Sequence, residues 1–231
     1  FRVCQGPHAF YIDPFLKDNP RCPDAEKQPQ AVEAVFVTHA HAHHAGDTLA
    51  IARQQPAQIV AVVETAAWLQ RQGAPAGQLV AANEGGTAGA AGVKAHLVHA
   101  AHSGGIFEAG QPVYCGKPVG YVFEFPNGPR IYHAGDTGLF GDMELIADLY
   151  HPDVALLPIG GMMPVGYYRK RRHWLDRGVH IDPDCALDIY ERLGAKNLVP
   201  VHWGTLHLFP ARHAPRKRLA AIAGERGAKN V

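Results

Sequence analysis

The sequence has few cysteines, no long apolar run and almost no net charge. Its 231 residues include four cysteines, without a C-x-x-C pair or a zinc-ribbon spacing, so we interpret them as reduced thiols of a cytoplasmic protein. No apolar run approaches the roughly 18 residues that cross a bilayer, so we expect no transmembrane segment. The formal net charge of +1 gives no strong signal for nucleic acid or an anionic membrane as partner.

The composition is that of an ordinary globular protein, with 47% hydrophobic and 19% charged residues. Short apolar, β-branched runs alternate with segments of helical periodicity, and residues 126–129 (Pro-Asn-Gly-Pro) indicate a tight turn. This pattern favours mixed sheets covered by helices. We predict strands at residues 8–12, 33–38, 58–63, 93–100, 119–125, 130–133, 153–157 and 198–201. We predict helices at residues 45–54, 64–72, 140–150, 182–193 and 215–224, and a hairpin or loop at residues 81–92.

Histidine is the exceptional residue type. There are fifteen histidines, and four of them, His39, His41, His43 and His44, fall within six residues directly after the predicted strand 33–38. In an extended segment, residues two apart point the same way, so His39 and His41 can reach one ion, and His43 continues the alternation. Neutral imidazole is a common ligand of zinc-like ions. One short turn can therefore present ligands to two metal ions.

Three further candidate ligands stand after apolar strands, where active sites of α/β proteins gather. They are His102, Asp136 and His202. A carboxylate such as Asp136 can bridge two cations, and the bridged pair would lower the pKa of a shared water toward neutrality, giving hydroxide as the nucleophile. An isolated histidine beyond a strand is more often structural, and we accept that interpretation for His96, His99, His151, His207 and His213.

In these residues the chain resembles the metallo-β-lactamase superfamily, and within it the branch that contains ascorbate-6-phosphate lactonase and phosphodiesterases of the N-acyl-phosphatidylethanolamine phospholipase D type. The resemblance covers nearly the whole chain. The matching segments are residues 12–16, 38–47, 101–103, 132–140, 157–161, 180–183 and 200–205.

The resemblance implies a single αββα domain over residues 1–231, with two mixed β-sheets flanked by helices and with most of its opening strand missing before Phe1. It implies one metal on His39, His41 and His102. It implies a second metal on His43, His44 and His202, with Asp136 bridging the two. His180 would lie near the substrate, and His43 or His180 would donate the proton to the leaving group.

The chain departs from the family pattern at His43, where the usual motif His-x-His-x-Asp-His has aspartate. Histidine can still bind metal or carry a proton, but it removes one negative charge. A second departure is the basic stretch Arg169 to Arg172, where relatives often carry a short acidic segment. It could bind a substrate phosphate, although we favour a solvated or subunit-contact loop.

The sequence therefore predicts a hydrolase in which a metal-bound hydroxide attacks an ester, a lactone or a phosphodiester, with His43, Asp136 and His180 as catalytic residues. Two alternatives stay open: a metal-binding protein whose catalysis is weakened or lost because of His43, and a nuclease of the same superfamily. We expect two divalent metal ions, zinc first, with manganese, iron or nickel also compatible with the ligands. The partner would be a small-molecule substrate, which could bear a phosphate, and a homo-oligomer is compatible with the sequence.

Overall fold

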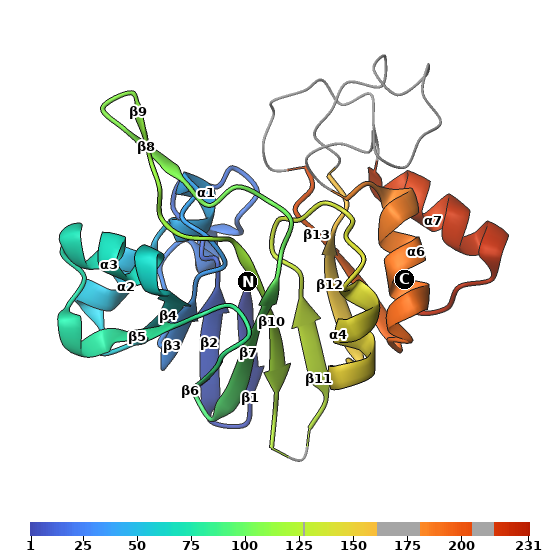
Figure 1. Cartoon of the computed structure of the whole chain (residues 1–231), viewed down its shortest axis with the longest axis horizontal. Helices are drawn as coiled ribbons and strands as arrows, with labels where there is room; N and C mark the ends of the chain where they lie inside the picture. Colours follow the sequence, from blue (N-terminus) through green and yellow to red (C-terminus); the bar gives the residue numbers. More distant parts are fainter. Residues whose placement is uncertain (127, 161–180, 205–214) are drawn as a thin grey trace. The chain divides into compact units, whose positions relative to one another are not determined.

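The computed structural model describes residues 1–126, 128–160, 181–204 and 215–231. The chain forms two compact units (Figure 1). Unit 1 comprises Phe1–His99 and Ser103–Pro126, and unit 2 comprises Ala100–His102 and Asn127–Val231. The expectation of one domain over residues 1–231 stays a prediction.

The first sheet of unit 1 is mixed. Its five strands lie in the order β1-β2-β3-β4-β5, and they span Arg2–Gln5, His8–Ile12, Ala34–Phe36, Gln58–Val62 and Leu79–Ala82. Strands β1 and β2 pair antiparallel, whereas β2 to β5 pair parallel. The helices of unit 1 are α1 (Ala42–Ala45), α2 (Thr48–Gln54) and α3 (Val63–Arg71), with short 3-10 turns η1 (Asp24–Glu26) and η2 (Ala76–Gln78). Because β3, β4 and β5 run parallel, their carboxyl ends lie along one edge of the sheet. Helices α1 to α3 form the connections between these strands.

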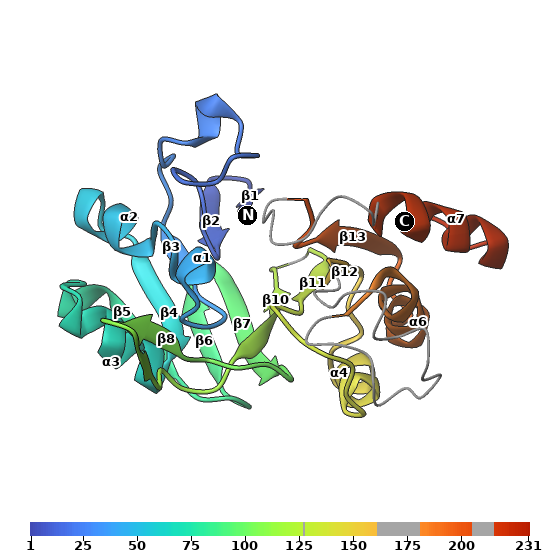
Figure 2. The same cartoon turned by 90° about the horizontal axis from the view of Figure 1, so that it is seen from above.

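The central strands β3 and β4 are buried on both faces, which explains their continuous apolar runs. Alternate residues of a strand point to opposite faces. On one face, Val35 packs in a core cluster with Leu69 of α3, and Figures 1 and 2 show α2 and α3 on this side of the strands. On the other face, Phe36 and Phe10 lie against Phe123, with ring centroids 4.9 and 5.0 Å apart. Helices and a second layer of strands therefore enclose the sheet within unit 1.

That second layer is antiparallel. Strands β6 (Thr87–Ala90), β7 (Val93–His99) and β10 (Val119–Glu124) lie in the order β10-β7-β6. A separate hairpin of β8 (Ile106–Glu108) and β9 (Gln111–Val113) projects from unit 1, as Figure 1 shows. This hairpin is tied to α3, because Glu108 accepts hydrogen bonds from the Trp68 indole and from Gln72.

Unit 2 contains three parallel strands in the order β13-β12-β11. They span Asn197–Val201, Val154–Pro158 and Arg130–His133, and the helices are α4 (Met143–Tyr150), α6 (Pro183–Leu193) and α7 (Pro215–Arg226). Helix α6 packs on β12 and lies between α4 and α7 (Figure 2). Asp182 caps this helix by accepting a hydrogen bond from the Cys185 amide at 2.8 Å, and Gly194 ends it with φ +61°.

The predicted strands and helices are confirmed, with three differences. The helix predicted for residues 45–54 is wrong in its extent, because Gly46 separates α1 from α2. The hairpin or loop predicted for residues 81–92 is wrong, because they hold the end of β5 and all of β6, which lie in different sheets. Strands β1, β5, β8 and β9 were not predicted. No helix among the described residues combines the length and apolar character that a membrane span requires.

Candidate metal centre

The histidine motif, residues 38–44, begins at the carboxyl end of β3 in unit 1. Strand β2 ends beside it in parallel register, with Ile12 opposite Phe36. The next residue, Asp13, continues the pairing by donating its amide to Phe36 O at 3.0 Å. Sheet pairing therefore places the Asp13 carboxylate next to the first residue of the motif, Thr38.

Asp13 organises the motif through three hydrogen bonds. Its Oδ1 accepts from the Thr38 amide at 2.8 Å, and its Oδ2 accepts from Thr38 Oγ1 at 2.6 Å and from His44 Nδ1 at 2.8 Å. The side chain is almost completely buried, and φ of +44° places the backbone in the left-handed region. That conformation costs a non-glycine residue about 1 kcal/mol, which the hydrogen bonds of this buried carboxylate offset.

These bonds determine which nitrogen of each ring can bind a metal. Thr38 gives its hydroxyl proton to Asp13, so at 3.0 Å it accepts the Nδ1 proton of His39. The lone pair of neutral His39 is then on Nε2, which lies 2.8 Å from Nδ1 of His41. In the same way, donation of the Nδ1 proton to Asp13 leaves the lone pair of His44 on Nε2. Such hydrogen bonds orient the ligands of metal sites.

His41 is held on its other side by Ser103, whose Oγ lies 3.2 Å from Nε2. Nδ1 of His41 therefore faces His39 while Nε2 faces the serine, and the two rings meet edge to face with centroids 4.4 Å apart. Nitrogen atoms that face each other at this distance suit two ligands of one ion.

His43 differs from the prediction. The extended alternation ends at His41, and both His43 and His44 lie in α1. The ring of His43 therefore stacks beside His41, with centroids 6.3 Å apart, and lies 4.4 Å from the ring of His44. Gly46 ends this short helix with φ +35°, and a side chain there would collide with the carbonyl oxygen of Pro14.

Burial also stabilises the base of the motif. The hydroxyl of Tyr121 donates to the carbonyl oxygens of Val37 and Val60, at 2.9 and 3.2 Å. Complete burial raises the pKa of Tyr121 well above its usual value, and the negative charge of Asp13 adds to this effect. The hydroxyl therefore stays protonated and connects the residue that follows β3 with the middle of β4.

The remaining predicted ligands lie together in unit 2. Asp136 Oδ2 is 3.8 Å from His102 Nε2 and 3.4 Å from His202 Nε2. The side chains of Asp136 and His102 are only 2% and 3% exposed. Both distances exceed the 2.7–2.9 Å of a charge-assisted hydrogen bond. A buried carboxylate is thus flanked by two imidazoles, and carboxylate oxygen and imidazole nitrogen are both ligand atoms of divalent metal ions.

Thr137 positions two of these residues. Its Oγ1 accepts from the Ala101 amide at 2.9 Å and donates to the Gly138 carbonyl oxygen at 2.8 Å, and the Gly138 amide donates to Ala101 O at 3.0 Å. The segment that carries His102 is therefore fastened to the segment that carries Asp136.

The structure thus gathers the predicted ligands in two groups, four histidines in unit 1 and His102, Asp136 and His202 in unit 2. His180 and the basic stretch at residues 169–172 lie outside the described residues. Sequence reasoning assigned no role to Asp13, Thr38, Ser103 or Thr137. For Asp13 a signal existed, because a polar residue directly follows an apolar strand.

Comparison with known proteins settles the family. The sequence model of a protein family, the beta-lactamase superfamily domain, matches residues 8–203. The chain belongs to the metallo-β-lactamase superfamily. A UPF0173 metal-dependent hydrolase from Rubrobacter xylanophilus is 41% identical over 220 residues, which cover 95% of this chain and 84% of that protein. Another from Koribacter versatilis is 35% identical over 96% of this chain and 88% of that protein. The chain is thus a member of a family of metal-dependent hydrolases.

Solved structures agree with this assignment. Igni18, a metallo hydrolase from Ignicoccus hospitalis, is similar to this chain with a TM-score of 0.76 and 31% identity, over all of this chain and 88% of Igni18. An isothiocyanate hydrolase from Delia radicum gut bacteria shares the fold, with a TM-score of 0.69, 99% of this chain and 90% of that chain covered, but only 17% identity. The predicted metallo-β-lactamase fold class is confirmed. The narrower resemblance to lactonases and phospholipase D-type enzymes, the cytoplasmic location and the oligomeric state stay predictions.

Proposed function

We propose that this chain is a two-metal hydrolase that cleaves an ester, a lactone or a phosphodiester of a small molecule. Its metal ligands would form two sets that share Asp136. His39, His41, His102 and Asp136 would hold one divalent ion, and His43, His44, Asp136 and His202 the other. Zinc is our first choice, because imidazole and carboxylate ligands suit it, although manganese, iron and nickel accept the same donors.

The observation that carries the proposal is the set of hydrogen bonds around Asp13. They leave the lone pairs of His39 and His44 on Nε2, the protonation state that a metal ligand needs. The buried Asp136 supports the proposal independently, since a carboxylate supplies oxygen donors that can serve both ligand sets. The donor set therefore fits divalent metal ions.

When bound, two such ions would lower the pKa of water and stabilise negative charge that develops on the substrate. The chain's own residues have other tasks. Asp13 and Thr38 hold the rings of His39 and His44, and Asp136 supplies negative charge. His43 lies at the surface of the motif, partly exposed, and we assign to it the transfer of a proton to the leaving group. His180 remains an alternative proton donor.

Substitution of the ligands tests the proposal. His39→Ala, His41→Ala and Asp136→Ala are each expected to abolish metal-dependent turnover on a panel of esters, lactones and phosphodiesters while the circular dichroism spectrum is retained. His8→Ala is the control, because this exposed histidine pairs with Glu33 and, among the described residues, with no proposed ligand. Elemental analysis of protein purified without added metal gives the metal content of each variant. Full turnover and full metal content in the ligand variants would refute the proposal.

A second candidate is a metal-binding protein with little catalysis, and the histidine at position 43 favours it. His43→Asp restores the residue of the usual motif and its negative charge. If the chain is a weakened enzyme, this variant should bind more metal and turn over the same panel faster. No gain in metal content or rate would count against that candidate and leave His43 as a functional residue.

A further inference from the structure

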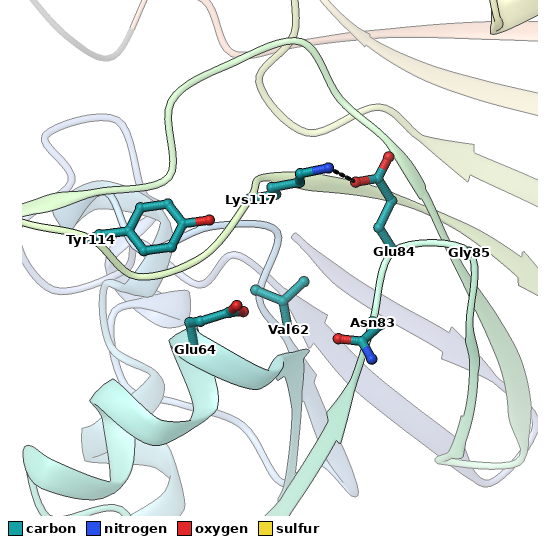
Figure 3. A pocket seen from close by; sticks show the side chains of 7 residues that line it. All are labelled: Val62, Glu64, Asn83, Glu84, Gly85, Tyr114 and Lys117. Atoms are coloured by element: carbon teal, nitrogen blue, oxygen red, sulfur yellow. Dashed lines mark ion pairs between the residues drawn. The ribbon is translucent and has the colours of Figure 1, made fainter.

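Unit 1 contains a pocket of about 500 Å³ at the carboxyl ends of β4 and β5. Figure 3 shows the side chains that surround it. It is lined by Val62, Glu64, Asn83, Glu84, Gly85, Tyr114 and Lys117. Val62 is the last residue of β4, and Asn83 follows the last residue of β5. In open sheets with parallel strands, ligands bind at this edge.

The pocket lies beside the histidine motif. Strands β3, β4 and β5 are parallel neighbours, so the motif that follows β3 shares the edge at which β4 and β5 end. The loop that carries Tyr114 and Lys117 enters β10 at Val119, whose amide donates to Thr38 O at 3.0 Å. A substrate in the pocket would therefore lie at the same sheet edge as His39, within the same unit.

The pocket is a built feature rather than a gap between loose loops. At Gly116, φ is +91°, and a Cβ would stand only 2.8 Å from Glu64 Oε2 and from a methyl carbon of Val62. Only glycine lets the loop approach α3 this closely. The buried hydroxyl of Thr65 donates to the carbonyl oxygen of Cys115 at 2.6 Å. The loop is thereby fixed against α3, and Lys117 and Tyr114 stand at the pocket.

Charge in the pocket is unevenly compensated. Lys117 Nζ lies 3.4 Å from Glu84 Oε2, and Glu84 Oε1 lies 2.9 Å from His99 Nδ1. The lysine is therefore neutralised by its own partner. Glu64 forms no ion pair with a described residue, so the lining of two carboxylates and one ammonium carries one excess negative charge. Tyr114, a residue that is 69% exposed, adds an aromatic ring.

We propose that this pocket binds a cationic ammonium group of the substrate, with Glu64 as the charge partner and Tyr114 as the aromatic surface. The inference rests on the proposed hydrolase function and adds the substrate class. Carboxylates attract ammonium groups, and aromatic faces attract them further. A phosphate group in the pocket would instead be repelled by the negative charge of the Glu64 carboxylate. The pocket therefore disfavours the phosphate-bearing substrates that the sequence left open.

A pair of esters of equal shape tests this inference. Acetylcholine carries a quaternary ammonium, and 3,3-dimethylbutyl acetate has a neutral carbon at the same position. We expect kcat/KM to be about fivefold higher for the cationic ester, the factor that one partly exposed charge contact contributes. The ratio of the two kcat/KM values is the readout, since it cancels effects on the shared chemistry.

Three variants assign the ratio to the pocket. Glu64→Gln should reduce it to about one, because the carboxylate is lost, and Lys117→Gln should raise it, because the pocket then loses its one ammonium group. Glu225→Gln makes the same change of charge on α7, outside the pocket lining, and should leave the ratio unchanged. A ratio of one in the wild-type chain, with both esters hydrolysed, would overturn the inference and leave the hydrolase proposal intact.

If neither ester is hydrolysed, the binding of choline tests the inference instead. Choline is titrated into the wild-type chain and the Glu64→Gln variant, and the nuclear magnetic resonance signals of the Tyr114 ring are followed. Saturable shifts in the wild-type chain that weaken about fivefold or more in the variant would support the pocket, even if the hydrolase proposal has failed. The absence of shifts, or equal shifts in both proteins, would overturn the inference.

Discussion

Asp13→Asn would replace one carboxylate oxygen by an NH2 group at nearly constant size. In the wild-type chain, Oδ1 faces the Thr38 amide, and Oδ2 faces two donors, Thr38 Oγ1 and His44 Nδ1. If the NH2 group takes the Oδ2 position, His44 must move its proton to Nε2, where the metal would bind. If it takes the Oδ1 position, two donors face each other at Thr38. Either orientation breaks the arrangement that prepares the histidine motif for metal.

The expected magnitude follows from these contacts. Loss of a residue that orients a metal ligand costs about 10–100-fold in metal affinity, which is about 1.4–2.8 kcal/mol. In the metal-free protein, a lost hydrogen bond to a charged group costs about 1.5–3 kcal/mol of folding stability. Backbone strain should not contribute, because asparagine tolerates the positive φ of residue 13 better than most residues.

The assay is zinc competition against a chromophoric chelator, combined with thermal unfolding of the metal-free protein. Asp18→Asn is the matched control, because it removes one carboxylate from an exposed position in the same segment. We expect the control to behave as wild type in both measurements. If Asp13→Asn binds zinc within twofold of wild type and unfolds at the same temperature, the role assigned to Asp13 is wrong.

Three further measurements address other parts of the structure. The buried hydroxyl of Tyr132 has no hydrogen-bond partner among the described residues, so Tyr132→Phe should stabilise the chain by about 1 kcal/mol, whereas Tyr121→Phe should destabilise it by about as much in urea unfolding. Hydrogen bonds from Lys196 and from the amide of residue 130 hold the pKa of Asp153 below its usual range. Its contribution to stability is therefore present above about pH 4 and lost as the pH falls through the depressed folded-state pKa. The stability difference between wild type and Asp153→Asn should accordingly shrink in acid, and a constant difference across the pH range would contradict this. Removal of metal with a chelator should lower the melting temperature, since a ligand at 100 times its Kd adds about 2.7 kcal/mol, and an unchanged melting temperature would argue against bound metal.

Much of the fold could be predicted because the strands of this chain carry local apolar patterns. The run around residues 34–36 is buried on both faces, and such a run identifies a central strand without knowledge of its neighbours. Strands β8 and β9 were missed for the opposite reason. Each has three residues, and none of them is buried, so they carry no apolar pattern to detect.

The histidine motif could also be found by reading along the chain, because its members are neighbours in sequence. The sequence by itself therefore determined the family, the order of most elements and the identity of the proposed ligands. It did not determine that His43 and His44 share a turn of helix, since the run His39 to His44 is compatible with extended backbone as well.

Only the tertiary structure decided which residues support that motif. Asp13 stands 31 positions before His44, and Ser103 stands 62 positions after His41. The pocket combines the ends of β4 and β5 with the loop before β10. Such partners are set by the pairing of strands, and no local period in the sequence encodes which strand ends meet.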